Sequence, residues 1–377
     1  MGKGKIRVLV VDDSNFMRKA ISNLLSQDPE IEVVGKARSG QEALELIPEL
    51  DPTVVTLDEE MAGLTGLETL ERIMAEYPRP VLMLSAYTKE GAEVTIEALR
   101  RGAIDFMEKP SGVVSLDMHT VAKHLIDKVK LAQRSRPRRP LRREPPRRKH
   151  PGIPRDEPES AATTQPSDTG RNKPEEIRKL VTPAESLLVV AASTGGVQAV
   201  QVVLTGLPHD WPMPTLIVQH MPPHFTESLA ADLDRVLPLR VVEAEDGMLL
   251  EPRTVYIAPG GMHAIVAPAR YRKGKKVVRL SQTPTDTVLK PAADVTMRAV
   301  ADVYGGDAIG VVLTGMGMDG AQGLKAMHEQ GAVTIAQDRE TSVIYGMPKA
   351  AFEIGAADSV LPLDQVAAAC RVSAGMG

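Results

Sequence analysis

A serine, a histidine and an aspartate each follow an apolar run in the C-terminal half of this 377-residue chain. The serine is Ser193 in "VVAASTGG", the histidine is His220 in "LIVQHMPP", and the aspartate is Asp319 in "VVLTGMGMDG". A serine hydroxyl acts as a nucleophile when a histidine takes its proton and a carboxylate orients that histidine. The two glycines after Thr194 permit a sharp turn that exposes the Ser193 side chain. These residue types at three strand ends predict a nucleophilic triad.

Each member of this triad has a simpler interpretation when taken alone. The "STGG" turn also fits a phosphate cradle at a helix N-terminus, and His220 and Asp319 fit a strand end and a turn. His263, in "PGGMHAIV", is a second candidate imidazole that follows a glycine turn. A non-catalytic phosphate-binding or ligand-binding module leaves His220 and Asp319 without a purpose, so the joint placement favours the triad. The glycine-rich "TGMGMDG" segment adds backbone N–H groups that can stabilise an oxyanion.

A second group of polar residues follows the apolar runs of the N-terminal half. Asp12 and Asp13 follow the first run, Asp58 the third, Ser85 the fourth and Lys109 the fifth. Three carboxylates at one sheet edge repel one another and require a cation, and oxygen ligands favour Mg²⁺. A carboxylate beside Mg²⁺ can accept a phosphoryl group, which the serine hydroxyl and the lysine would then bind. Helix capping explains one aspartate but not five matching residues at four strand ends.

Alternating apolar runs and helical patterns organise both halves of the chain. The first half has five short runs rich in β-branched residues, separated by helical segments, which is typical of a doubly wound α/β domain. The pattern resumes near residue 185 with six further runs, from "SLLVVAAS" to "GAVTIAQD". We therefore predict two doubly wound α/β domains, residues 1–131 and 185–377, the second with a mainly parallel sheet. Ligands bind beyond the carboxyl ends of the strands in such sheets, which is where both polar groups lie.

Residues 132–184 separate the two predicted domains. Within them, residues 133–160 contain nine arginines, one lysine, four acidic residues and seven prolines, with almost nothing apolar. Such a segment buries too little surface to offset its ordering entropy, so we expect a disordered basic linker. The segment has no aromatic residues for base stacking, so its charge does not indicate nucleic-acid binding.

The composition excludes several other classes of protein. Hydrophobic residues make up 43% and charged residues 25% of the chain, the mixture of a globular protein. The single cysteine, Cys370, excludes an intramolecular disulfide and suits a reducing compartment, so we expect the protein in the cytoplasm. No apolar run approaches the about 18 residues of a membrane span, so we expect no membrane insertion.

The motifs "VVDDS", "TLDEEM…G", "LSAYT" and "DFMEKP" resemble the receiver domain of two-component response regulators over about residues 5–130. The resemblance implies a flavodoxin-like fold and phosphorylation of Asp58 from a histidine kinase. It further implies that Mg²⁺ is held by the acid cluster, and that three residues act as the switch. The implied metal ligands are Asp12, Asp13, Asp58 and the backbone of Glu60, and the implied switch residues are Ser85, Phe106 and Lys109.

The motifs "ASTGG", "QHMPP", "YIAPGG", "LTGMG" and "YGMP" resemble the catalytic domain of the CheB family of chemotaxis protein-glutamate methylesterases, over about residues 185–368. The resemblance implies that Ser193 is the nucleophile, His220 the general base and Asp319 the acid that orients it. It places Thr194 beside the nucleophile and the Met316 backbone in the oxyanion site. The implied substrates are methylated chemoreceptors, which lose methanol, and some members also deamidate receptor glutamines. No cofactor is implied for ester hydrolysis.

Two other functions compete with this interpretation. A response regulator that binds DNA requires a helix-turn-helix output domain, and the strand-rich C-terminal half argues against one. A response regulator with a non-catalytic ligand-binding output domain remains the alternative, and loss of the Ser193 hydroxyl would leave its function intact. The order of the two domains favours an enzyme in which the receiver controls the hydrolase.

Overall fold

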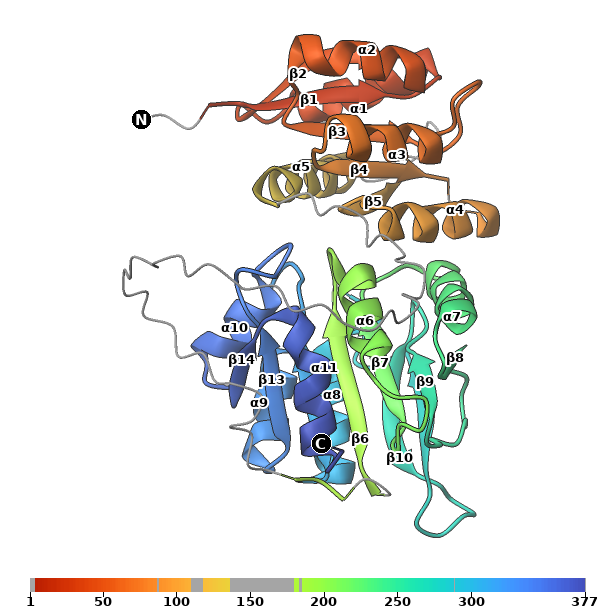
Figure 1. Ribbon diagram of the computed structural model, residues 1–377, viewed down its shortest axis with the longest axis vertical. Coiled ribbons are helices and arrows are strands. Elements are labelled where there is room, and N and C mark those ends of the chain that lie inside the picture. Colours follow the sequence, from red (N-terminus) through yellow and green to blue (C-terminus); the bar gives the residue numbers. More distant parts are fainter. Residues whose placement is uncertain are drawn as a thin grey trace, which may run out of the picture.

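The computed structural model describes residues 4–86, 88–109, 118–135, 180–182, 185–287 and 289–376. These residues form two α/β halves stacked along the long axis of the molecule (Figure 1). Most of the predicted linker, and therefore the expectation of disorder there, lies outside the described residues. None of the described helices is both long and apolar enough to cross a membrane.

The N-terminal half contains a parallel sheet of five strands in the order β2-β1-β3-β4-β5. This order is the flavodoxin-like one, with the change of winding direction between β1 and β3. Side-chain caps from Ser14, Ser39, Thr65 and Thr88 start its first four helices. The elements are β1 (Ile6–Val11), α1 (Asn15–Leu25), β2 (Ile31–Ala37), α2 (Gly40–Leu50), β3 (Val54–Asp58), α3 (Gly66–Glu76), β4 (Val81–Ser85), α4 (Lys89–Arg100), β5 (Asp105–Glu108) and α5 (Met118–Arg134).

The C-terminal half contains a parallel sheet of seven strands in the order β14-β13-β12-β6-β7-β9-β8. Its central strands are almost wholly buried because helices cover both faces. The strands are β6 (Leu187–Ala192), β7 (Thr215–Gln219), β8 (Arg240–Glu243), β9 (Thr254–Ile257), β10 (His263–Pro268), β11 (Lys276–Ser281), β12 (Ala308–Val312), β13 (Val333–Gln337) and β14 (Ser359–Leu361). The helices are α6 (Gly196–Thr205), α7 (Phe225–Val236), α8 (Ala293–Tyr304), α9 (Ala321–Glu329), α10 (Met347–Glu353) and α11 (Leu363–Ser373).

The chain enters this sheet at its middle. Strand β6 pairs with β7 on one side and with β12 on the other, so the winding direction changes at β6. A crevice beyond the carboxyl end of the strands is expected at such a point. Ser193, His220 and Asp319 follow β6, β7 and β12, so this topology brings all three to the crevice.

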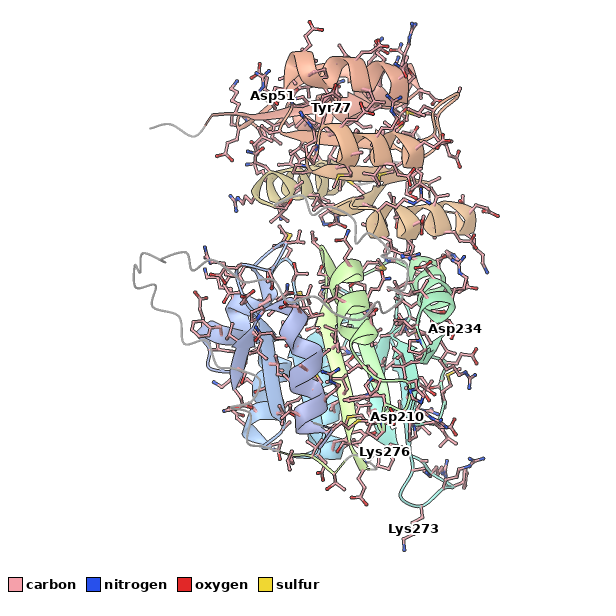
Figure 2. The ribbon with its side chains drawn as sticks, viewed as in Figure 1. Asp51, Tyr77, Asp210, Asp234, Lys273 and Lys276 are labelled. Atoms are coloured by element: carbon pink, nitrogen blue, oxygen red, sulfur yellow. The ribbon has the colours of Figure 1, made fainter. Side chains whose placement is uncertain are left out.

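The prediction of two doubly wound α/β domains is confirmed, with differences in detail. The sequence patterns missed β8 and β14, which have only four and three residues, and β10, which ends in Pro268. The predicted strand "KVVRLSQ" exists as β11 but pairs antiparallel with β10 in a separate hairpin rather than in the main sheet. Figure 2 labels Lys273 at the tip of that hairpin, at the end of the molecule farthest from the N-terminal half. Helix α5 continues to Arg134, beyond the predicted boundary at residue 131.

Candidate active site

Ser193 lies in a tight turn between β6 and α6. Its backbone N–H donates to Thr314 O at 3.0 Å, and its carbonyl oxygen accepts from the N–H of Gly196 at 2.7 Å. Gly195 has φ of +76°, a conformation that a side chain would strain. The amide nitrogen of Gln219 also donates to Ser193 O at 2.9 Å, which ties the turn to the end of β7. The serine is therefore fixed at the strand end with its side chain partly exposed.

His220 is held beside this turn. Its backbone N–H donates to Ala192 O at 3.1 Å, so it extends the pairing of β6 and β7 by one residue. Its ring Nε2 lies 2.8 Å from Asp319 Oδ2. Its ring Nδ1 is buried and has no hydrogen-bond partner among the described residues. With Nε2 bonded to the carboxylate, Nδ1 is the nitrogen that can take a proton from a serine hydroxyl.

Asp319 is held by the start of helix α8. Its Oδ2 accepts from Ala293 N at 2.6 Å, and its Oδ1 accepts from Asp294 N at 2.9 Å. Burial acts to raise the pKa of Asp319, but the hydrogen bond and charge of His220 and these backbone donors outweigh it, so the pKa is lowered. The carboxylate is therefore ionised and oriented, as a residue that steers a histidine must be.

The "TGMG" loop passes beside Ser193. The loop passes so close that a Cβ on Gly315 would lie 2.8 Å from Ser193 Cβ. The N–H groups of Thr194 and Met316 donate to no described residue. Such unused donors near a nucleophile can bind the oxyanion that forms when it attacks a carbonyl. Thr194 and Met316, which the sequence analysis assigned to the oxyanion site, therefore lie close to the serine. Thr194 is buried, whereas the side chain of Met316 is 44% exposed.

His263 does not belong to this group. It is fully buried (0% exposed), at the start of β10. It does not line either cavity that contains Ser193 and His220. His220 is therefore the imidazole that the structure brings to the serine.

The N-terminal half gathers its predicted acidic residues at the switch point of its sheet. Carboxylate oxygens of Asp12, Asp13 and Asp58 all lie within 4.8 Å of one another. Asp12 Oδ2 and Asp58 Oδ2 are buried and have no hydrogen-bond partner among the described residues. Buried carboxylate oxygens that accept no hydrogen bond fit a hard divalent cation such as Mg²⁺. The Glu60 backbone adjoins the group, since its N–H donates to Asp58 Oδ1 at 3.2 Å.

Lys109 supplies positive charge to the same pocket. Its Nζ lies 2.5 Å from Asp58 Oδ1 and 3.6 Å from Asp12 Oδ2. Burial raises the pKa of Asp58 to about 6, although the hydrogen bond from Lys109 opposes the shift. Burial acts to lower the pKa of Lys109, but the hydrogen bond to Asp58 and the nearby aspartate charges have the larger effect, so the pKa of Lys109 is raised. The pocket thus holds excess negative charge in a poorly hydrated place, where a cation binds favourably.

Ser85 is held by two residues that the sequence analysis missed. Its hydroxyl donates to Glu59 Oε2 at 2.7 Å, and the hydroxyl of Thr95 on α4 contacts both Ser85 and Glu59. Burial raises the pKa of Glu59 to about 7. The consecutive acids in "LDEEM" hid this role, because sequence alone does not show which of them is buried.

Residues of β5 connect the two halves. The carboxylate of Asp105 accepts a hydrogen bond from the Thr194 hydroxyl at 2.7 Å. The ring of Phe106 stacks on Phe225 of α7, with 4.4 Å between centroids, so the predicted switch aromatic lies against the other half. A cavity of about 770 Å³ remains between the halves, and both Lys109 and Ser193 line it. The N-terminal half therefore covers the serine without filling the space around it.

Charged side chains extend this contact along α4, which faces the C-terminal half (Figure 1). Arg100 lies 3.1 Å from Asp232 on α7, and Lys89 lies 2.7 Å from Glu227 at the exposed rim. Gln198 of α6 donates to the Leu99 carbonyl oxygen, which adds a polar contact behind the serine turn. Neither Asp105 nor these α4 residues could be picked out from the sequence, because their role exists only after the halves dock.

The fold and the geometry define a class of protein: a response regulator whose receiver adjoins a Ser-His-Asp arrangement. The family model of the response regulator receiver domain matches residues 8–119, and that of CheB methylesterase matches residues 188–370. The chain is 45% identical over 365 residues to a protein-glutamate methylesterase/protein-glutamine glutaminase of Geobacillus kaustophilus, covering 97% of each chain. It is 44% identical over 364 residues to the protein of that name from Pyrococcus abyssi, covering 96% of this chain and 92% of that one. The chain belongs to the CheB family of protein-glutamate methylesterases/protein-glutamine glutaminases.

Proposed function

We propose that this chain hydrolyses methyl esters of glutamate side chains on chemoreceptors, and that phosphorylation of Asp58 controls the reaction. The observation that carries the hydrolytic part is the 2.8 Å contact between His220 Nε2 and Asp319 Oδ2, which leaves Nδ1 free to act as a base in a cavity that Ser193 also lines. A module that only binds a ligand has no use for this pairing. The matches to named relatives over nearly the whole chain support the choice of substrate.

The reaction follows from the arrangement of these groups. The Ser193 hydroxyl attacks the ester carbonyl while His220 Nδ1 takes its proton, and Asp319 stabilises the imidazolium that results. The N–H groups of Thr194 and Met316 bind the oxyanion. The C–O bond to the methoxy group then breaks, and Nδ1 returns the proton so that methanol leaves. A water molecule, deprotonated by Nδ1, hydrolyses the acyl-serine and leaves a glutamate carboxylate.

The same steps accommodate a glutamine side chain. Attack on the amide carbonyl gives the same acyl-serine, and the imidazolium protonates the leaving amine so that ammonia departs. The relatives carry both activities in their names, and we extend both to this chain.

The receiver half supplies the control. A histidine kinase donates the phosphoryl group, and the Asp58 carboxylate accepts it. Asp12, Asp13, Asp58 and the Glu60 backbone would hold Mg²⁺, which neutralises phosphoryl charge when bound. Lys109 pairs with the phosphoryl group in place of the Asp58 carboxylate, and Ser85 leaves Glu59 to donate a hydrogen bond to it.

We assign residues 1–131 to the receiver, 132–184 to the linker and 185–377 to the hydrolase, and we place the reaction in the cytoplasm.

The contact between the halves explains how control reaches the serine. Asp105, at the start of β5, accepts a hydrogen bond from the hydroxyl of Thr194, which is the residue after the nucleophile. A receptor helix, about 10–12 Å across with its side chains, needs the space that the receiver fills. We infer that the unphosphorylated receiver excludes the receptor and that phosphorylation weakens the contact.

Methanol release tests this function. Membranes that carry methylated chemoreceptor are mixed with wild-type protein, Ser193→Ala or Asp319→Asn, and labelled methanol is counted over time. We expect release by the wild type and a loss of about 10³-fold or more in Ser193→Ala, because members of a triad act as a unit. Unchanged release by Ser193→Ala would overturn the nucleophile assignment. A wild type without activity on any methylated receptor would favour the ligand-binding alternative.

A further inference from the structure

His263 is a buried imidazole that the proposed reaction does not use. Its Nδ1 accepts a hydrogen bond from the backbone N–H of Ala292 at 3.2 Å. Its Nε2 lies 3.1 Å from the carbonyl oxygen of Pro284 and 3.1 Å from the hydroxyl of Thr287. Because Nδ1 accepts from a backbone donor, the ring proton is on Nε2, which donates to Pro284 O. The environment therefore selects one neutral tautomer of His263.

The residue that His263 holds is the N-cap of helix α8. That residue is Ala292, whose side chain has no oxygen to accept from the first turn. The next two N–H groups, of Ala293 and Asp294, donate to the two oxygens of Asp319 instead. Asp319 therefore caps α8 from another loop, and the start of α8 in return fixes the orientation of that carboxylate.

We propose that His263 is a positioning residue of the hydrolase. Its hydrogen bond to Ala292 N holds the start of α8 in place, and the N–H groups of Ala293 and Asp294 there orient the Asp319 carboxylate towards His220. The inference rests on the proposed function, since it assigns His263 a part in that same reaction. The chain of contacts runs from His263 Nδ1 to Ala292 N, through the first turn of α8 to Asp319, and then to His220 Nε2. Each step is a hydrogen bond or a single peptide unit, so a shift at Ala292 moves the carboxylate directly.

A second contact between α8 and β10 provides a control. The Thr296 hydroxyl donates to Ala264 O at 2.8 Å, one turn further along the helix. Thr296 is as buried as His263, and its loss weakens the same packing between helix and hairpin. The Thr296 hydroxyl also lies 3.4 Å from Ala292 O, but the Thr296 N–H donates to that same oxygen at 3.3 Å and remains in Thr296→Val. Thr296 makes no hydrogen bond to the N–H groups of Ala292, Ala293 or Asp294, so Thr296→Val tests the packing of α8 separately from the orientation of those N–H groups.

The test compares two replacements of His263 that each retain half of its hydrogen bonding. In His263→Asn the side-chain oxygen takes the place of Nδ1 and can still accept from Ala292. In His263→Gln the longer amide reaches the place of Nε2 and leaves Ala292 N unpaired. We expect His263→Gln to lower kcat for methanol release by about tenfold to a hundredfold with KM little changed, because displacement of a catalytic group by about 1 Å has a cost of that size. We expect His263→Asn and Thr296→Val to retain most of the wild-type kcat, even where thermal stability falls.

A spectroscopic measurement makes the test independent of the substrate. The proton shared by His220 Nε2 and Asp319 gives a downfield NMR signal, identified by its loss in Asp319→Asn. The signal should weaken in His263→Gln and persist in His263→Asn and Thr296→Val. Equal losses of kcat in all three variants, or a wild-type kcat in His263→Gln, would overturn the positioning role. A wild type that shows the signal but releases no methanol would count against the proposed function and not against this inference.

Discussion

Asp105 of the receiver accepts a hydrogen bond from the hydroxyl of Thr194, which directly follows Ser193. The same carboxylate oxygen accepts from Lys128 of α5 at 2.6 Å, so it is fixed from within its own domain. One residue further along β5, Phe106 stacks on the hydrolase residue Phe225. A change in β5 caused by phosphorylation would therefore reach the nucleophile turn without an intermediate element.

Replacing Asp105 with alanine should raise the activity of the unphosphorylated protein. The change removes a hydrogen bond to a charged acceptor, which contributes roughly 1.5–3 kcal/mol when it is well formed. Because other contacts still hold the halves together, we expect basal methanol release to rise about threefold to tenfold, with phosphorylated activity unchanged. Glu76→Ala is the control, since among the described residues Glu76 forms an ion pair only with exposed Arg72 on α3. Equal basal rates in the two variants would show that Asp105 does not restrain the serine.

The two ion pairs between α4 and α7 should differ in their effect on closure. Lys89 and Glu227 are 58% and 47% exposed, and exposed pairs contribute about 0–1 kcal/mol. Arg100 and Asp232 are 23% and 7% exposed, so Arg100→Ala leaves a buried carboxylate with Arg235 as its remaining cationic partner. We expect Arg100→Ala to raise basal methanol release clearly, and Lys89→Ala to change it by less than about twofold.

A second substitution checks this reasoning. Asp232→Asn in the Arg100→Ala background removes the buried charge that has lost its Arg100 partner, so it should lower basal release again. Unfolding temperatures of all variants show whether the hydrolase itself has been damaged. A larger effect of Lys89→Ala than of Arg100→Ala would contradict the assignment of closure to the buried pair.

Small esters should escape the control that governs receptor substrates. The cavity of about 770 Å³ beside Ser193 has the size of a typical small-molecule site. A helix about 10–12 Å across with its side chains would fill that volume in less than about two turns, so a receptor helix does not fit. We therefore expect p-nitrophenyl acetate to be hydrolysed at similar rates before and after phosphorylation, while methanol release from receptor rises. The release of p-nitrophenol, followed spectrophotometrically, and the release of labelled methanol are compared on one protein preparation. The same activation factor for both substrates would mean that phosphorylation alters the triad rather than access to it.

The acid pocket of the receiver should destabilise the protein at neutral pH when Mg²⁺ is withheld. The pKa of Asp58 is raised from 3.8 to about 6, so the folded state binds this proton more tightly than the unfolded state does. The folded state is therefore penalised above pH 6, on the order of 3 kcal/mol, and the penalty is relieved as pH falls from 6 towards 4. Asp58→Asn should raise the unfolding temperature at pH 7.5 by several degrees.

Calorimetry with and without Mg²⁺ completes this test. The cation should raise the unfolding temperature of the wild type, and it should raise that of Asp58→Asn much less, because one ligand and its charge are gone. A lower unfolding temperature in Asp58→Asn without Mg²⁺ would show that the contact with Lys109 outweighs the burial of the carboxylate.

The residues at strand ends could be predicted from sequence, because the topology of a doubly wound sheet places them at one edge. That reasoning applied to Asp58 and Lys109 in the receiver and to Ser193, His220 and Asp319 in the hydrolase, and the structure brings each group together. Their catalytic and binding roles remain predictions until they are tested.

Other features depended on contacts that no local pattern encodes. Asp105 and Thr194 are 89 positions apart, and their hydrogen bond exists only in the docked arrangement. Glu59 looks like an exposed neighbour of Asp58, yet the end of β3 turns it inward to Ser85. The β11 sequence has the composition of a sheet strand, but its short connection to β10 makes it one arm of a hairpin.

Methanol release measured before and after phosphorylation tests the central claim that the receiver covers Ser193 until Asp58 is modified. Wild-type protein and Asp58→Asn are each assayed on methylated receptor with Mg²⁺, with and without acetyl phosphate. We predict that wild-type release rises at least about tenfold, a coupling of about 1.4 kcal/mol, and that Asp58→Asn stays at its basal rate. Wild-type release that does not respond to acetyl phosphate, or an equal rise in Asp58→Asn, would contradict the claim.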